Sequence, residues 1–185
     1  MLQKKSCFNP RSLFALIFCY FFSQQITAQS LSANSYIITY APLAQSLSAK
    51  TGIPASVILG IALIESGHGS GENCKKLRNH FGIKGKNHLP EQGINYKSAY
   101  RSYLSDEASF GHFCTIIKRK KYYPILKENK DFNIWLATMN RFYYSSAGLV
   151  WVNKILYAIK RHHLNKFDLP QQQLDGSPKM NWMHA

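Results

Sequence analysis

The stretch that decides the fold is Ile53–Gly85, IPASVILGIALIESGHGSGENCKKLRNHFGIKG. A largely apolar run, residues 57–64, leads directly into Glu65, and a loop of serine and glycine follows. Pro54 suits the first turn of a helix, because the N–H group that proline lacks has no partner there. We therefore predict a central helix over residues 54–66 that carries Glu65 close to its C-terminal end.

Glu65 shares one face of this helix with Ile58, Ile61 and Ala62. A carboxyl group on an apolar face is poorly solvated, which favours its protonated form. A carboxyl group that stays protonated near neutral pH is what a general acid must supply. The alternative is that Glu65 is simply the first polar residue after a core helix and points into solvent.

Four blocks of sequence, in this order, resemble a known family. They are ALIESGHGSG (62–71), NHFGIKG (79–85), AYRSYLSDEASFGHF (99–113) and YYSSAGLVWVNKI (143–155). Together they are similar to the endo-β-N-acetylglucosaminidases of bacterial peptidoglycan turnover, glycoside hydrolase family 73, which includes flagellar muramidase domains and autolysins. The resemblance spans roughly residues 36–164. It implies a mainly helical, lysozyme-like core (α+β) with a small β-hairpin lobe beside a substrate cleft.

The resemblance implies that Glu65 is the general acid that protonates the leaving oxygen in glycoside hydrolysis. The family has a second acid between the second and third blocks, and in this chain that window holds only Glu91. Glu91 is therefore the candidate base, or the group that stabilises the developing cation. If Glu91 is only a turn residue, the acetamido group of the substrate or an activated water would take its place. Tyr144, with Tyr143 as the alternative match, is implied to lie near the scissile bond.

The resemblance also implies a set of residues that bind substrate. His68 stands where the family often has tryptophan, so the aromatic surface for the sugar is different here. For the aromatic members of the set, core packing is the alternative. No cofactor is implied, and no spacing of histidine and cysteine predicts a metal site. The substrate-binding candidates are His68, Phe81, Lys84, Tyr103 and Tyr143.

Elsewhere the sequence predicts further helices and one region of extended chain. Ser105 is typical of a helix N-cap, and this position alone explains the acids Asp106 and Glu107 in the first turn. Turn residues between 86 and 104 favour the β-hairpin. Helices are expected over residues 35–50, where Pro42 would kink or divide the element, and over 74–79, 105–118, 132–142 and 149–163, the last with Val150, Ile155, Tyr157 and Ile159 facing the core.

Residues 1–28 have the pattern of a secretory signal. Basic residues precede a short apolar run, 13–22, and a cleavage site follows Ala28. The run is shorter than the roughly 20 residues of a membrane-spanning helix, so we expect no membrane anchor after cleavage. The domain would then be 29–165, followed by a polar tail, 166–185. This predicts an exported protein of the periplasm or the extracellular envelope.

Charge and cysteine content agree with an exported protein. The segment 1–28 holds three of the 23 basic residues and none of the nine acidic ones, so the remaining chain keeps a net charge of +11. In the envelope, peptidoglycan with its free carboxylates is the expected partner, rather than nucleic acid. Cys74 and Cys114 could pair there, or could remain two buried free thiols. A monomer is expected.

The resemblance thus implies an exported enzyme that cuts β-1,4 bonds of peptidoglycan strands as an endo-β-N-acetylglucosaminidase. Two alternatives stay open. The first is a muramidase or lytic transglycosylase on the same scaffold, since such enzymes can work with one essential glutamate. The second is a non-catalytic module that binds peptidoglycan.

Overall fold

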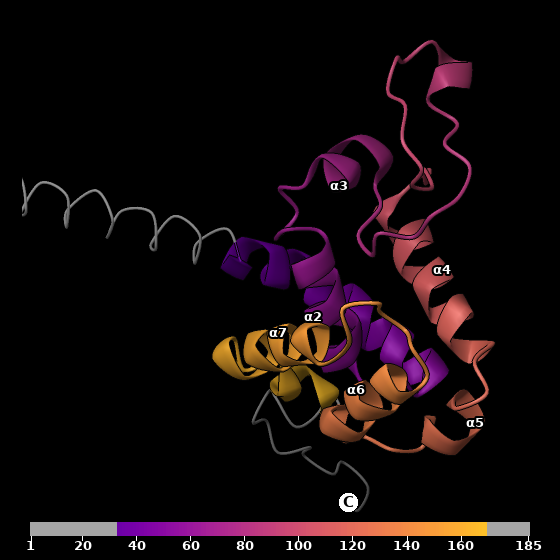
Figure 1. Ribbon diagram of the computed structural model, residues 1–185. Helices are drawn as coiled ribbons and strands as arrows, with labels where there is room; N and C mark the ends of the chain where they lie inside the picture. Colours follow the sequence, from indigo (N-terminus) through magenta and orange to yellow (C-terminus); the bar gives the residue numbers. More distant parts are fainter. Residues whose placement is uncertain (1–32, 170–185) are drawn as a thin grey trace, which may run out of the picture.

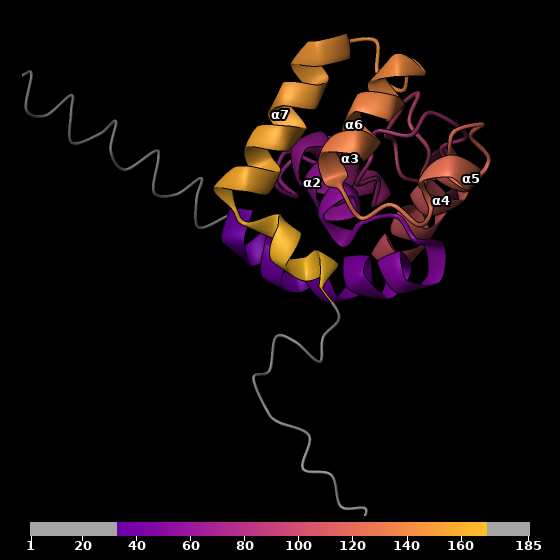
Figure 2. The same ribbon diagram turned by 90° about the horizontal axis from the view of Figure 1, so that it is seen from below.

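The computed structural model describes residues 33–169, and the helix α2 (Ala55–Glu65) lies at its centre. Every residue from Ala55 to Leu63 is buried. A helix that is apolar all round needs cover on all sides, and Figures 1 and 2 show other helices around α2. The central helix predicted over 54–66 is confirmed to within one residue at each end.

The elements that surround α2 are helical. A helix over residues 33–51 runs without a break through Pro42, so the division predicted at this proline is not found. α7 and the 3₁₀-helix η2 both pack extensively against α2. In chain order the other elements are α3 (Glu72–Leu77), η1 (Pro90–Gln92), α4 (Asp106–Lys118), α5 (Tyr123–Leu126), α6 (Phe132–Arg141), α7 (Gly148–Arg161) and η2 (Leu164–Asp168).

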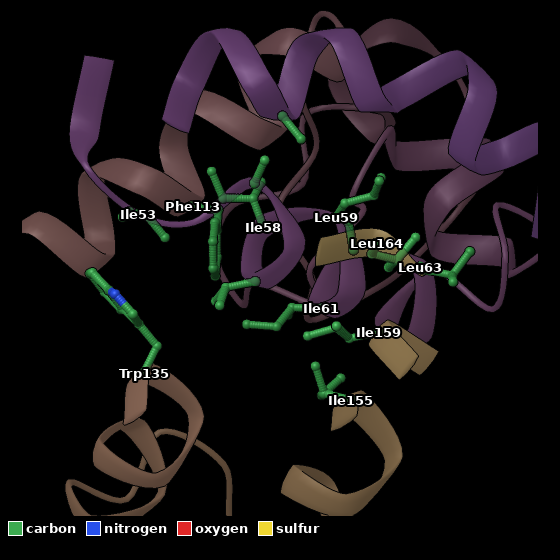
Figure 3. Packing of buried hydrophobic residues seen from close by; sticks show 14 of the residues in the cluster. Ile53, Ile58, Leu59, Ile61, Leu63, Phe113, Trp135, Ile155, Ile159 and Leu164 are labelled. Atoms are coloured by element: carbon green, nitrogen blue, oxygen red, sulfur yellow. The ribbon is translucent and has the colours of Figure 1, made fainter. Parts of the chain in front are cut away.

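The core forms where α2, α4, α6 and α7 meet (Figure 3). Gly60 lets α7 approach α2 closely, because a Cβ atom at this position would lie 2.9 Å from Cγ1 of Ile159. The inward stripe of α7 contains Ile155 and Ile159, as predicted, but Val150 and Tyr157 are exposed. The buried positions next to the predicted ones are Trp151, Val152 and Ala158.

Side-chain caps begin two helices where the sequence predicts them. The Ser105 hydroxyl accepts a hydrogen bond from the N–H of Ala108 at 3.2 Å, and α4 follows. Asp131 caps α6 by accepting from the N–H of Asn133 at 2.7 Å. These caps satisfy N–H groups that have no partner within the helix.

The N-terminus of α2 is capped from the other end of the domain. Pro54 offers no side-chain cap. Instead, Oδ1 of Asp168 accepts a hydrogen bond from the N–H of Ser56 at 2.8 Å. Since Phe167 also packs against the core, the folded domain extends past the boundary predicted at residue 165. The rest of the predicted tail, 170–185, lies outside the described residues.

The predicted β-hairpin is not found. Residues 33–169 contain no strand, only one antiparallel bridge between Lys84 and Tyr100. Beyond the bridge the chain lacks the alternation of apolar side chains that would hold two strands on a core. Residues 86–99 therefore form a long loop with η1 at its outer end (Figure 1). Side chains hold this 86–99 loop together; for example, Asn87 donates to the carbonyl of Tyr96 at 2.6 Å.

Cys74 and Cys114 are both buried and unpaired, so the disulfide considered above does not form and the alternative of two buried thiols holds. The predicted signal, 1–28, lies outside the described residues. Between residues 33 and 169, no helix has both the length and the apolar character that crossing a membrane requires.

Candidate active site

The candidate site lies at the C-terminal end of α2, where Glu65 is exposed. The indole N–H of Trp151, from α7, donates a hydrogen bond to Oε1 of Glu65 at 2.8 Å. On the side of Oε2 the backbone of Gly82 comes close, because a Cβ atom at this position would lie 3.6 Å from this oxygen. The carboxyl group is thus accessible and held in one orientation.

The burial expected for Glu65 on an apolar face is therefore wrong, and the reason is local. The helix ends at Glu65, and the chain then turns through Gly67 and His68, which both have positive φ. The N–H of His68 returns to the carbonyl of Leu63 at 2.8 Å, and Ser66 accepts from the N–H of Gly69 at 2.9 Å. Because the chain turns away directly after Glu65, no further element covers its side chain, and the continuously buried part of α2 ends at Leu63.

Gly82 is held opposite Glu65 by the side chain of Asn79. The Asn79 amide donates to the carbonyls of Ile83 and Arg101, both at 2.8 Å, and its oxygen accepts from the N–H of Ile83 at 3.0 Å. Gly82 has a φ of +62°, a conformation that glycine adopts without strain. The ring of Tyr100 lies on the same side, 3.8 Å from the position of a Cβ at Gly82.

Tyr144 forms an aromatic wall of the site together with Trp151. Their ring centroids are 5.2 Å apart, and Tyr144 also meets Phe113 edge to face. Burial, and then the nearby Glu65 carboxylate, raise the pKa of the Tyr144 hydroxyl. This hydroxyl therefore stays protonated at neutral pH and is available as a donor. The structure places Tyr144 near Glu65, and its role beside the scissile bond stays a prediction.

Two other predicted residues lie at the margin of the site. Tyr143 precedes Tyr144 but is 91% exposed and has a φ of +54°, an uncommon conformation for a residue with a side chain. His68 is partly buried three residues after Glu65, and burial lowers its pKa, so it is neutral at pH 7. Both stay predictions as substrate-binding residues.

None of the remaining substrate-binding candidates is recorded in contact with the Glu65 carboxyl group within residues 33–169. Phe81 is 5% exposed and stacks on Phe113 at 4.2 Å, so in this structure it is a core residue. Lys84 is exposed at the Lys84–Tyr100 bridge. Tyr103 lines a separate pocket, where its hydroxyl lies 2.8 Å from Nδ1 of His112.

Glu91 is not brought to Glu65 in this structure. It belongs to η1, at the outer end of the 86–99 loop and away from the end of α2 (Figure 1). Its partners are Lys86, with Nζ 2.8 Å from Oε1, and His88, with Nδ1 3.0 Å from Oε2. Hydrogen bonds from these two residues lower the pKa of Glu91. Glu91 is thus a carboxylate at neutral pH, and its role as a second catalytic group stays a prediction.

The sequence analysis does not predict a buried polar network that lies behind the site. His80 is almost completely buried, with Nε2 3.2 Å from Oδ1 of Asp106 and Nδ1 2.7 Å from the Tyr36 hydroxyl. Asp106 also accepts from the Tyr40 hydroxyl at 2.8 Å. Asp106 thus does more than begin a helix: with His80 it ties α4 to the 33–51 helix. Because His80 comes two residues before Gly82, the network also fixes the backbone that faces Glu65.

We expect the midpoint of thermal unfolding (Tm) to fall as the pH is lowered from 7 to 5. Burial is the main cause of a lowered pKa at His80, His68, His112 and His162. Below the unfolded value of about 6.5, the unfolded chain therefore binds more protons than the folded one. Stability is fully present above this pH and is lost as the pH falls. Buried Asp168, with a raised pKa, acts in the opposite direction as a single group.

The measurement is Tm by circular dichroism at intervals between pH 7.5 and 5, above the range of exposed carboxylates. For a chain of this size, each 1 kcal/mol lost lowers Tm by about 2–4 °C. A Tm that stays constant or rises on acidification would contradict the expectation.

The fold and the site together define a lysozyme-like class, in which a buried helix presents a glutamate at its end. Residues 41–164 match the family Glucosaminidase, described as mannosyl-glycoprotein endo-beta-N-acetylglucosaminidase, and the chain belongs to this family. The resemblance carried by the four sequence blocks is thereby confirmed, and the protein is a glycoside hydrolase by family.

Solved structures share the fold at low sequence identity. An N-acetylmuramoyl-L-alanine amidase from Staphylococcus aureus superposes with a TM-score of 0.63 at 20% identity, over 76% of this chain and 44% of that one. The catalytic domain of the autolysin Auto from Listeria monocytogenes gives 0.59 at 19%, over 74% and 88%. A truncated glycoside hydrolase domain of FlgJ from Salmonella typhimurium gives 0.57 at 18%, over 71% and 97%. No curated protein sequence matches this chain.

Trp151 is the site residue that the sequence could have revealed. It lies within the fourth resembling block, and at helical spacing it aligns with Ile155 and Ile159 on the inward stripe of α7. A buried indole N–H needs a hydrogen-bond acceptor, and the end of α2 supplies one. No comparable signal points to the contact between His80 and Asp106, since neither sequence separation nor spacing brings them together.

Proposed function

We propose that this protein is a peptidoglycan hydrolase that cuts β-1,4 bonds of the glycan strand as an endo-β-N-acetylglucosaminidase, with Glu65 as the general acid. The observation that carries the proposal is the Glu65 carboxyl group, exposed at the end of α2 and oriented by the N–H of Trp151. The substrate class is supported by the family and by solved structures of the same fold, among them a peptidoglycan hydrolase from Sphingomonas sp. A1.

In the proposed reaction Glu65 acts as the general acid and gives a proton to the leaving oxygen as the glycosidic bond breaks. Positive charge then develops on the sugar ring, and the resulting Glu65 carboxylate is stabilised by the hydrogen bond from Trp151. Tyr144, still protonated, can donate to a sugar or to the incoming water. Water finally adds to the sugar carbon and releases a proton, and a proton returned to the Glu65 carboxylate completes the hydrolysis.

The structure does not identify a second catalytic group beside Glu65. The groups around Glu65 come from Trp151, Gly82 and Tyr144, and none of them is a carboxylate. For Glu91 to act, the 86–99 loop would have to bring it to within about 5–5.5 Å of Glu65 for retention, or about 6.5–9.5 Å for inversion. Otherwise the acetamido group of the substrate or a tyrosine-bound water takes this role.

This single-glutamate arrangement favours one alternative function, a muramidase or lytic transglycosylase on the same scaffold. Such an enzyme would cut the other β-1,4 bond of the strand, and a transglycosylase would use the hydroxyl of the sugar itself in place of water. In all cases we propose that the enzyme is exported to the periplasm or the outer surface of the cell after removal of residues 1–28.

The test is a digest of purified peptidoglycan with residues 29–185, reduced with borohydride and analysed by mass spectrometry. New reducing ends on N-acetylglucosamine, absent with Glu65→Gln, would establish the proposal. Ends on N-acetylmuramic acid, or anhydro products, would replace it with the alternative. The absence of all products would leave only the non-catalytic binding module.

Trp151→Phe is expected to lower the rate of cleavage by about 10- to 100-fold. The phenyl ring keeps the packing of α7 but removes the N–H donor to the Glu65 carboxyl, and a hydrogen bond to a charged group contributes about 1.5–3 kcal/mol. The measurement is the initial rate of peptidoglycan cleavage across pH, together with Tm.

Trp135→Phe is the matched control, because it removes an equivalent indole hydrogen bond, to the carbonyl of Asn129 at 2.8 Å, within the core. It should lower stability and leave the rate per folded molecule unchanged. Equal losses of rate in both variants would show that Trp151 acts only through packing.

A further inference from the structure

A second concave site lies beside the candidate active site. It is a pocket of about 800 Å³ between α3, the 86–99 loop and the first turns of α4. Its lining includes Arg101 and Tyr103, but none of the residues around Glu65. The mechanism proposed above does not use this pocket.

The pocket carries a surplus of positive charge. Lys76, Arg78 and Arg101 line it, and its only acid, Glu91, is already paired with Lys86. Neither arginine forms an ion pair with any carboxylate in residues 33–169. Two guanidinium groups without a carboxylate partner form a site for anions, and guanidinium geometry suits the two oxygens of a carboxylate.

The other groups of the pocket leave this charge in place at neutral pH. Burial raises the pKa of Tyr103 to about 12, so its hydroxyl stays neutral. Burial, followed by Arg101 and Arg119, lowers the pKa of His112, so its ring is neutral as well. Leu104, which is 90% exposed, adds an apolar wall. Cationic groups beside an apolar wall fit short peptides with carboxylates and aliphatic side chains better than bare sugar.

The pocket is joined to the Glu65 site by the backbone itself. Tyr100 lies near Gly82 and Glu65, while the next residue, Arg101, lines the pocket. Successive residues of an extended segment point to opposite sides, so the two sites are one residue apart along the chain. The stem of Arg101 is fixed against Gly85, where a Cβ atom would lie 3.3 Å from that of Arg101.

We propose that this pocket binds the carboxylate-bearing peptides attached to the glycan strand. A strand that passes over Glu65 carries such peptides on alternate sugars, and the pocket adjoins the Glu65 site through the consecutive residues Tyr100 and Arg101. The inference rests on the proposed function for its choice of polymer. It makes Arg78 and Arg101 the residues that distinguish peptide-bearing strands from bare ones.

The test measures binding rather than cleavage, using residues 29–185 with Glu65→Gln so that the polymer stays intact. Arg78→Asn is combined with Arg101→Gln; asparagine is chosen because Arg78 has a φ of +51°, which asparagine tolerates. Binding is measured by co-sedimentation with insoluble peptidoglycan, and with the same glycan after an amidase has removed its peptides. We expect the double variant to bind intact peptidoglycan at least tenfold more weakly, with little change on the peptide-free glycan.

Lys50→Gln with Lys160→Gln is the matched control, since it removes the same charge from exposed positions outside the pocket. Equal losses in both double variants, equal losses on both polymers, or no binding to either polymer by the Glu65→Gln protein would overturn the proposal. Tm confirms that each variant is folded. Binding requires no catalysis. A digest without products would therefore overturn the proposed activity, whereas the co-sedimentation experiment would still test the peptide-binding pocket.

Discussion

Glu65→Gln is expected to lower the rate of peptidoglycan cleavage by about 10²- to 10⁴-fold, the range that general acid catalysis contributes. Glutamine keeps the size and the oxygen that accepts from Trp151, but its amide cannot give a proton to the leaving oxygen. Since Glu65 is exposed at the end of α2, the change should leave Tm within about 2–4 °C of the original value, equivalent to roughly 1 kcal/mol. Rates follow from the release of reducing ends under saturating substrate.

Glu91→Gln is the natural comparison, because it neutralises an exposed carboxylate on the 86–99 loop by the same chemical change. If the loop stays as the structure shows it, this variant should keep most of the activity. A loss as large as that of Glu65→Gln would show that the loop closes and that Glu91 is the second group. Full activity of Glu65→Gln itself would remove the general acid from the mechanism.

The predictions that succeeded rest on local sequence. The end of α2 and the cap at Ser105 are each determined by a few neighbouring residues, and the structure confirms them. The position of Glu65 near the C-terminal end of α2 also follows from the local pattern, an apolar run that stops at a carboxylate and a glycine-rich loop. These features need no knowledge of which distant segments meet.

The predictions that failed depend on contacts between distant segments. The sequence predicts Val150 and Tyr157 in the core, but both are exposed, because apolar character alone does not fix the phase of the buried stripe on α7. The role of Asp168 as a cap for α2 could not be read, because the acid and the N–H it accepts from are 112 residues apart. Likewise, the turn residues of the 86–99 loop predict a hairpin, but the loop has no apolar face that could pack two strands against the core.

Gly52→Ala is expected to have the largest effect on stability, a loss of about 2–5 kcal/mol out of a total that is typically about 5–15 kcal/mol. Gly52 has a φ of +73°, and holding a residue with a side chain in this conformation costs about 1–2 kcal/mol. In addition, a Cβ atom here would lie 2.1 Å from the carbonyl oxygen of Lys127. This neighbour is backbone, so relief requires moving the chain after α5 away from the turn before α2, and such overpacking costs about 1–3 kcal/mol.

Gly93→Ala separates the two causes, because Gly93 has nearly the same φ, +78°, but nothing within 4 Å of its Cβ position. It should therefore lose only the conformational contribution of about 1–2 kcal/mol. Urea unfolding of both variants measures the difference as a shift in midpoint at constant slope. If the two variants lose the same free energy, the close approach of Lys127 to Gly52 contributes nothing. A larger loss at Gly52 would show that the close approach of the Lys127 carbonyl leaves no room for a side chain in the turn before α2.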